Sequence, residues 1–277
     1  MTGSTSTDHP VALVVGAACP PGIGSATARL LAARGVRVVC AERIVDADGP
    51  LPDTACARSR DLDAVVESVR AAGGTAIALP LDPADVHAGQ HAVDETVAAF
   101  GRVDLVAHVS GGLGPALGSG PLLNVTPAAW ARGLDVNLTA AFAVATAAAR
   151  QMVAQDGGGS IVLLSSHAVP GLPREGVGTF AAAKAAVERL VRDLADEVGA
   201  HGIRVNAVRP LGVDPKATSG GNPHLSRLVD ADGAATVNAM GRFQQPDETA
   251  AVIDFLLGAG ASFVNGAAID VDGGARW

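Results

Sequence analysis

Residues 11–31 read VALVVGAACPPGIGSATARLL, an apolar run that passes through a glycine-rich turn into an amphipathic stretch. The run predicts a buried strand at Val11–Val15, and the stretch predicts a helix at Ile23–Arg34. Glycines between a strand and a helix let backbone N–H groups approach a pyrophosphate at the positive end of the helix. We therefore predict that a dinucleotide binds at this turn, through Gly16, Gly22, Ile23 and Gly24.

The same alternation of apolar runs and amphipathic stretches continues along the chain. Further strands are expected at Val36–Ala41, Thr75–Leu81, Val103–Val109, Ser160–Leu164, Arg204–Val208 and Ala267–Val271. Further helices are expected at Asp61–Ala72, Pro83–Phe100, Pro127–Ala154, Thr179–His201 and Asp247–Leu257. A chain with 48% hydrophobic residues can bury a sheet on both faces, so we predict an α/β fold with a doubly wound, parallel, seven-stranded sheet flanked by helices.

The chain is expected to form one domain over residues 11–277, after a polar tail over residues 1–10. Two segments break the alternation. Ile44–Arg60 has no clear period and is interpreted as an insertion. Leu211–Thr236 is rich in Gly, Pro and Ser and follows a late strand, where ligands bind in parallel sheets, so it is interpreted as a substrate lid or as a surface loop.

Charge and cysteine usage limit the partners and the location. A net charge of −8 and a pI near 5.3 argue against nucleic acid or an anionic membrane as the main partner. The longest apolar helical stretch, Leu138–Ala149, is too short to span a bilayer, and the tail lacks the pattern of a signal peptide. Because Cys19, Cys40 and Cys56 form no CxxC pair, no metal site or disulfide framework is expected, and a cytoplasmic location fits best.

Residues that follow the second, third and fourth strands are candidates for contact with the cofactor. Glu42 lies about 20 residues past the glycines, where a carboxylate accepts hydrogen bonds from a ribose diol and repels a 2′-phosphate. NAD(H) is therefore favoured over NADP(H), although the adjacent Arg43 weakens this preference. Asp82 has two interpretations, an adenine contact or the cap of a helix beginning near Pro83. Ser110 and Gly111 either bring the backbone close to the cofactor or form a plain turn.

Together these residues resemble the short-chain dehydrogenase/reductase family over Val11 to Gly274. The resemblance also rests on Val103–Leu105, Asn137, Ser165–Ser166, Lys184, Arg204–Pro210 and Val271–Gly274. It implies a single Rossmann-like domain, a nicotinamide cofactor and a homo-oligomer, commonly a tetramer. The segment Ile44–Arg60 is similar to an insertion in carveol-dehydrogenase-like members.

The resemblance also implies roles for four residues. In the family, a tyrosine is the general acid/base, a serine polarises the same substrate oxygen, a lysine binds the nicotinamide ribose and lowers the tyrosine pKa, and an asparagine holds a proton-relay water. Ser166 (or Ser165), Lys184 and Asn137 match the family pattern. Phe180 occupies the tyrosine position, and the chain contains no tyrosine at all.

A benzyl group cannot exchange a proton, so a redox reaction needs another donor. His167 follows Ser166 and is the first candidate because imidazole titrates near neutrality, although a loop histidine without a function is an alternative. His108 stands where the family has asparagine and is either turned to the cofactor or a hydrogen-bonded, semi-buried histidine. Lys184 is a further candidate, since desolvation would make it a base.

The predicted function is that of an NAD(P)(H)-binding oxidoreductase acting on a hydrophobic alcohol or ketone with a non-standard proton donor. Two alternatives stay open. One is a non-redox enzyme on the same scaffold, such as a cyclase, dehydratase or lyase. The other is a catalytically silent subunit that pairs with an active homologue. An engineered replacement of a native tyrosine would also explain Phe180.

Overall fold

The computed structural model describes residues 9–18, 22–44, 59–82, 85, 87–171, 176–213 and 238–275. Several predicted features fall outside these ranges. They are most of the tail over residues 1–10, most of the insertion Ile44–Arg60, most of the segment Leu211–Thr236, and the cysteines Cys19 and Cys56.

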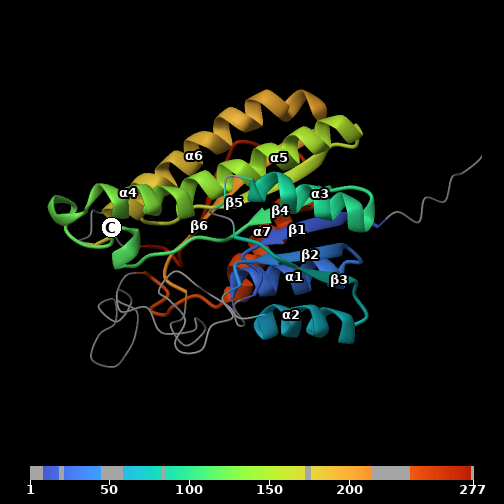
Figure 1. Cartoon of the computed structure of the whole chain (residues 1–277), viewed down its shortest axis with the longest axis horizontal. Coiled ribbons are helices and arrows are strands. Elements are labelled where there is room, and N and C mark those ends of the chain that lie inside the picture. Colours follow the sequence, from blue (N-terminus) through green and yellow to red (C-terminus); the bar gives the residue numbers. More distant parts are fainter. Residues whose placement is uncertain are drawn as a thin grey trace, which may run out of the picture.

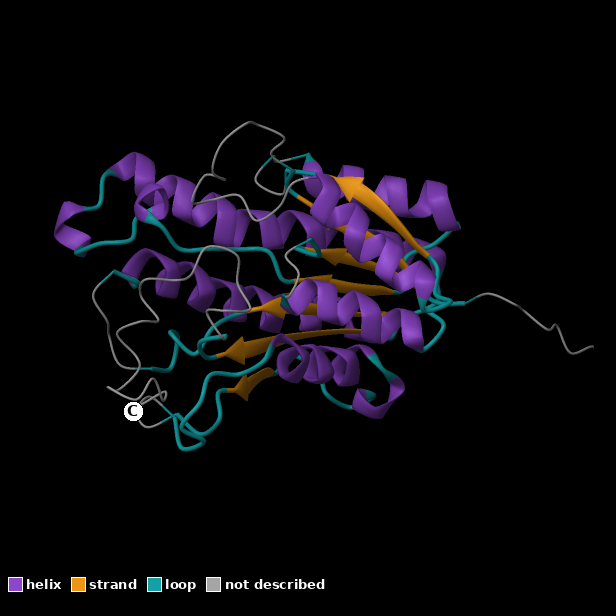
Figure 2. Cartoon of the chain, turned by 90° about the horizontal axis from the view of Figure 1, so that it is seen from below, coloured by secondary structure: helices purple, strands orange, loops and turns teal. Residues whose placement is uncertain are grey.

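The described residues form a seven-stranded, fully parallel sheet with the strand order β3-β2-β1-β4-β5-β6-β7. Figure 2 shows the strands pointing in one common direction. The predicted fold class is therefore confirmed. The strands are β1 (Val11–Val15), β2 (Arg37–Glu42), β3 (Ala76–Pro80), β4 (Leu105–His108), β5 (Gly159–Leu164), β6 (Ile203–Pro210) and β7 (Ala268–Val271).

Helices cover both faces of the sheet (Figure 1), and each face has its own apolar core. One core joins the sheet to α3 (Ala88–Phe100), α5 (Ala140–Gln155) and α6 (Gly178–Val198), and α5 follows α4 (Pro127–Leu134) along the chain. The other joins it to α1 (Ile23–Ala33), α2 (Ser59–Ala71) and α7 (Pro246–Leu257). Burial on both faces explains why β1 is apolar at every position. Within the described ranges, no helix has the length and apolar character that a membrane span requires.

The predicted helix Pro127–Ala154 is interrupted near its middle. A π-helical turn over Asp135–Thr139 separates α4 from α5. At this turn Asn137 Nδ2 donates to the carbonyl oxygen of Gly133 over 3.0 Å, so a side chain takes part of the hydrogen bonding that a regular α-helix leaves to the backbone. Such wide turns often accompany functional residues, and Asn137 is one of the predicted site residues.

The predicted helix Pro83–Phe100 begins later than expected. α3 starts at Ala88, and its N-cap residue is His87. The backbone N–H of His87 donates to Asp85 Oδ1 over 2.9 Å in the turn before the helix. Asp82 is therefore not the cap of α3, and that interpretation of Asp82 was wrong.

Candidate functional site

The glycine turn packs against the end of β4 with no room for a side chain. Gly16 has a φ of +95°, and a Cβ atom built there would lie 2.7 Å from the backbone nitrogen of Ser110. A Cβ atom on Gly24 would lie 2.0 Å from the carbonyl oxygen of Gly16. β1 is the point where the strand order reverses, with β2 on one side and β4 on the other. This is the crevice in which open parallel sheets bind their ligands.

Glu42, the last residue of β2, lies beside the glycine turn. Its side chain is buried, with 3% of the residue exposed. Oε2 accepts a hydrogen bond from the N–H of Ala18 over 3.2 Å, and Oε1 accepts one from Arg43 N–H over 2.9 Å. Burial raises the pKa of Glu42, while the two backbone N–H groups and the charge of Arg43 act in the opposite direction. The carboxylate is thus fixed at the turn where the sequence predicts a nucleotide.

Asp82, which follows β3, forms an ion pair with Arg43. Arg43 Nε lies 3.3 Å from Asp82 Oδ2, and about half of the Asp82 side chain is exposed. The pair lies next to Glu42, because Glu42 is paired with Pro80 in the β2–β3 register. An adenine contact of Asp82 stays a prediction.

Asn137 anchors the segment that follows β4. Its Oδ1 accepts from Gly112 N–H over 2.9 Å, and its Nδ2 donates to the Gly112 carbonyl over 3.0 Å. A Cβ atom on Gly111 would lie 2.8 Å from Asn137 Oδ1 and 3.1 Å from Lys184 Nζ. The structure therefore brings Asn137, Gly111 and Lys184 together at the carboxyl edge of the sheet.

Lys184 lies in α6 and is almost completely buried, with 1% of the residue exposed. Its Nζ donates a hydrogen bond to the carbonyl oxygen of Leu164 over 2.8 Å. Burial lowers the pKa of Lys184 to about 8. The half-buried ring of Phe180, one helical turn earlier, has its centroid 5.6 Å from Nζ. Phe180 and Lys184 are therefore neighbours on one face of α6.

His108 ends β4 and is also buried, with 1% of the residue exposed. Burial, assisted by the charge of Lys184, lowers the pKa of His108 to about 3, so the imidazole is neutral at physiological pH. Its Nε2 has no hydrogen-bond partner among the described residues. A hydrogen bond with the backbone of His108 itself acts against the lowering of the pKa, so both expectations for this position stay predictions.

The two candidate serines after β5 have different surroundings. Ser165 is buried, and its Oγ donates to Glu188 Oε1 over 2.6 Å. Ser166 is half-buried, and its Oγ accepts a hydrogen bond from Ala168 N–H over 3.1 Å. Because the hydroxyl of the buried Ser165 already donates to Glu188, Ser166 is the better of the two candidates for contact with a substrate.

Glu188 is the centre of a buried ionic network that the sequence analysis did not identify. Arg209, near the end of β6, binds both Glu188 oxygens, with Nε–Oε1 and Nη2–Oε2 distances of 2.6 Å. Its Nη1 lies 3.3 Å from Asp270 Oδ1 on β7. The network connects α6, one turn after Lys184, with the ends of three adjacent strands.

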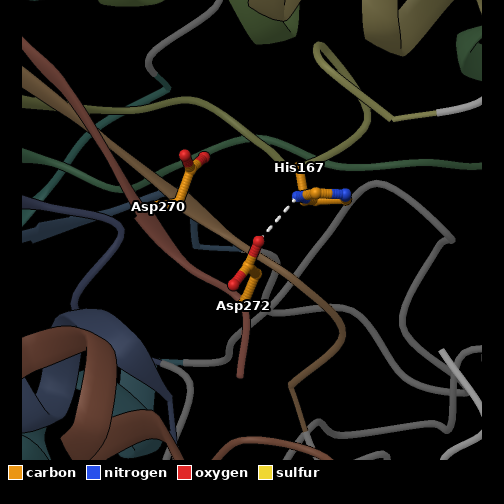
Figure 3. Close-up of side chains that lie close together, drawn as sticks. All are labelled: His167, Asp270 and Asp272. Atoms are coloured by element: carbon orange, nitrogen blue, oxygen red, sulfur yellow. Dashed lines mark ion pairs between the residues drawn. The ribbon is translucent and has the colours of Figure 1, made fainter. Parts of the chain in front are cut away.

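His167 lies against the end of β7 (Figure 3). Its Nδ1 is 3.1 Å from Asp272 Oδ2, and 6% of the residue is exposed. Asp270 is nearby, and one ligand atom from each of the three residues lies within 4.8 Å of the others. Asp272 belongs to the Val271–Gly274 motif of the family resemblance, and its contact with His167 was not predicted. Asp270 lies in β7 and Asp272 directly follows it, and their spacing of two residues was the available signal that they share one side of the chain.

Comparisons with known proteins match nearly the whole chain. The family model described as Enoyl-(Acyl carrier protein) reductase matches residues 16–276. The chain is 36% identical over 267 residues to a cis-4-hydroxycyclohexanecarboxylate dehydrogenase of Sinomonas cyclohexanicum, covering 95% of both proteins. A short-chain type dehydrogenase/reductase from Mycobacterium ulcerans has a similar structure, with a TM-score of 0.81 at 30% identity, covering 96% of this chain and 92% of that one. The structure of carveol dehydrogenase from Mycobacterium avium in complex with NAD has a TM-score of 0.83 at 26% identity, and the match covers 98% of this chain and 99% of that one.

Proposed function

The chain belongs to the short-chain dehydrogenase/reductase family, and we propose that it is an NAD(P)(H)-dependent oxidoreductase of a hydrophobic alcohol or ketone whose proton donor is not a tyrosine. The observation that carries this proposal is the meeting of Asn137, Gly111 and Lys184 beside the glycine turn. A buried lysine at the carboxyl edge of a parallel sheet suits an enzyme better than an inert subunit, because an unpaired buried ammonium is costly.

The residues of the crevice fit a dinucleotide cofactor. Because Gly16 and Gly24 carry no side chains, the turn packs directly against the backbone after β4 and against itself, which holds the start of α1 at the carboxyl end of β1. We assign the pyrophosphate to the glycine turn and to the N-terminus of α1, which begins at Ile23 after its N-cap Gly22, because the positive end of a helix favours an anion. Glu42 would hold the adenosine ribose. A bound nicotinamide would supply hydride transfer, which none of the side chains can perform.

The remaining roles follow the family resemblance. We assign Ser166 to the substrate oxygen, Lys184 to the nicotinamide ribose and Asn137 to the support of the segment after β4. Ser110 and Gly111 would lie against the nicotinamide side of the cofactor. Phe180 would present an apolar wall where other members carry tyrosine, which suits a hydrophobic substrate. Assembly into a homo-oligomer also stays a proposal.

The substrate class is supported by the names of similar proteins. The dehydrogenase that is 36% identical acts, by its name, on an alcohol carried by a cyclohexane ring. We therefore propose a cyclic or otherwise bulky secondary alcohol, or the corresponding ketone, as the substrate class.

The proposed function predicts both binding and turnover of the cofactor. Adding NADH is expected to raise the thermal unfolding midpoint and to change NADH fluorescence, because ligand binding stabilises the folded state. Cyclic ketones, including 4-oxocyclohexanecarboxylate, are then expected to oxidise NADH in the presence of the protein. Absence of NADH and NADPH binding would contradict the proposal. Binding without NADH oxidation across the panel would instead support a non-redox enzyme or a silent subunit.

The buried carboxylate of Glu42 predicts the cofactor preference. Two negative charges about 4 Å apart repel by about 1–4 kcal/mol near a protein surface, so the wild-type protein is expected to prefer NADH over NADPH. Glu42→Ala is expected to shift the ratio of kcat/KM values toward NADPH by about tenfold or more. Glu67→Gln removes the same charge from an exposed site on α2 and serves as the control. An unchanged ratio in Glu42→Ala would remove Glu42 from the nucleotide site.

A further inference from the structure

Lys184 is a buried cation without a counter-charge. Among the described residues, no carboxylate lies within ion-pairing distance of Nζ, and its hydrogen-bond acceptor is the neutral carbonyl of Leu164. A buried ammonium without a partner is less stable relative to the neutral amine than one in water, so it releases its proton more easily. Burial lowers the pKa of Lys184 to about 8, which is within the range where proton exchange with a substrate is efficient.

The polar groups that face Lys184 supply no negative charge that would stabilise its ammonium form. From β4, His108 is neutral at physiological pH, since its pKa is lowered to about 3. From the π-helical turn, Asn137 contributes an uncharged carboxamide close to Gly111. On α6 itself, Glu188 lies one turn later, but Ser165 and Arg209 already bind its carboxylate.

Phe180 contributes to the same environment from the preceding turn of α6. Its ring centroid is 5.6 Å from Nζ, a cation–π contact that attracts the ammonium but supplies no negative counter-charge, and the net effect of the surroundings is still a lowered pKa. Gly111, in the segment that follows β4, packs so closely against Nζ that a Cβ atom there would lie 3.1 Å from it. The amine therefore lies between a half-buried aromatic ring on its own helix and the glycine backbone that follows β4.

We propose that Lys184 is the catalytic residue that donates the proton to the substrate oxygen during ketone reduction, in place of the missing phenol. The inference rests on the proposed function. As the carbonyl carbon accepts a hydride, the electron pair of the C=O bond moves to oxygen. That oxygen takes a proton from Nζ, so one N–H bond breaks and one O–H bond forms. The neutral amine then recovers its proton from water.

The composition of the chain supports this role for lysine. Lys184 and Lys216 are the only two lysines among 20 lysine and arginine residues. An arginine would supply a permanent positive charge, but a guanidinium does not release its proton in proteins. A lysine in a chain that otherwise uses arginine is consistent with a group that must change its charge.

The first test measures the pKa of Lys184 in the cofactor-free protein. Lysine labelled with carbon-13 at Cε gives two resonances, and the Lys216→Arg variant identifies the one from Lys184. We expect the Lys184 signal to titrate near pH 8, the value to which burial lowers its pKa. A midpoint within about one unit of the ordinary lysine value of about 10.4 would overturn the proposal.

The second test uses Lys184→Arg, which keeps the charge and removes the transferable proton. We expect kcat for ketone reduction to fall by about 10²–10⁴-fold while the NADH dissociation constant stays within about tenfold. Wild-type kcat for reduction is expected to decline above about pH 8, because the protonated amine is the donor, and this decline is expected to be absent in the variant. A variant that keeps both the wild-type rate and the alkaline decline would overturn the proposal.

A further variant covers the case in which arginine disturbs folding or NADH binding. Lys184→Ala is assayed with added alkylammonium ions, and we expect rates that increase with the acid strength of the added ion. Rates independent of that ion would count against a proton transfer from this position. The two proposals fail in different ways, since a wild-type protein without hydride transfer contradicts the proposed function, whereas hydride transfer at full rate in Lys184→Arg contradicts the role of Lys184 alone.

Discussion

Replacing Phe180 by Tyr is expected to raise kcat for ketone reduction by about 10²-fold, near the lower end of what a positioned general acid contributes. The ring of Phe180 lies 5.6 Å from Lys184 Nζ, so the added hydroxyl would enter the neighbourhood of a positive charge. An adjacent ammonium favours the phenolate and lowers the phenol pKa toward neutrality. The phenol would then pass a proton from Lys184 to the substrate, and the amine would not have to reach the oxygen itself.

The measurement compares kcat and KM for NADH and a ketone panel in the wild-type protein and in Phe180→Tyr. Phe142→Tyr is the matched control, because Phe142 is 48% exposed on α5 and gains the same hydroxyl away from Lys184. An unchanged kcat in Phe180→Tyr with intact NADH binding would mean that this ring does not border the substrate. Equal gains in both variants would mean that the effect is unrelated to the site.

The sequence predicts the elements of the sheet well, because each strand is recognisable from local composition. Val11–Val15 is a continuous apolar run between a tail and a glycine, and the structure has β1 over the same residues. The errors come from features with a non-local cause. The π-helical turn at Asp135–Thr139 depends on the bonds of Asn137 to Gly112, which is 25 residues earlier. No periodicity within the helix carries that information.

The same distinction between local and non-local causes applies to the residues of the candidate site. Gly16 and Gly24 are visible in the sequence because a tight strand-to-helix turn imposes glycine locally. The contact between His167 and Asp272 and the one between Glu188 and Arg209 depend on strand register, which pairs Pro210 with Val271 and Leu164 with Val208. The burial of Lys184 could not be predicted either, because lysine is almost never fully buried and a lysine in a sequence is therefore expected to be exposed.

Arg209→Met is expected to lower the free energy of unfolding by about 3 kcal/mol, and the thermal midpoint by about 6–12 °C. The substitution leaves the Glu188 carboxylate, with 9% of its side chain exposed, without the guanidinium that binds both of its oxygens. Ser165 then remains as a donor to Glu188, and a single hydroxyl does not offset a buried negative charge. Thermal and denaturant unfolding of the two proteins at pH 7 measure the difference.

Arg242→Met is the matched control, because the chain offers a second ion pair of equal length. Arg242 and Glu248 also meet at 2.6 Å, but their side chains are 47% and 41% exposed. Exposed pairs contribute little to stability, so the unfolding midpoint of this variant is expected to stay close to that of the wild type. A further variant, Glu188→Leu with Arg209→Met, removes both charges and is expected to recover part of the loss, since no buried charge then lacks a partner. Equal losses in Arg209→Met and Arg242→Met would mean that burial does not set the strength of the pair.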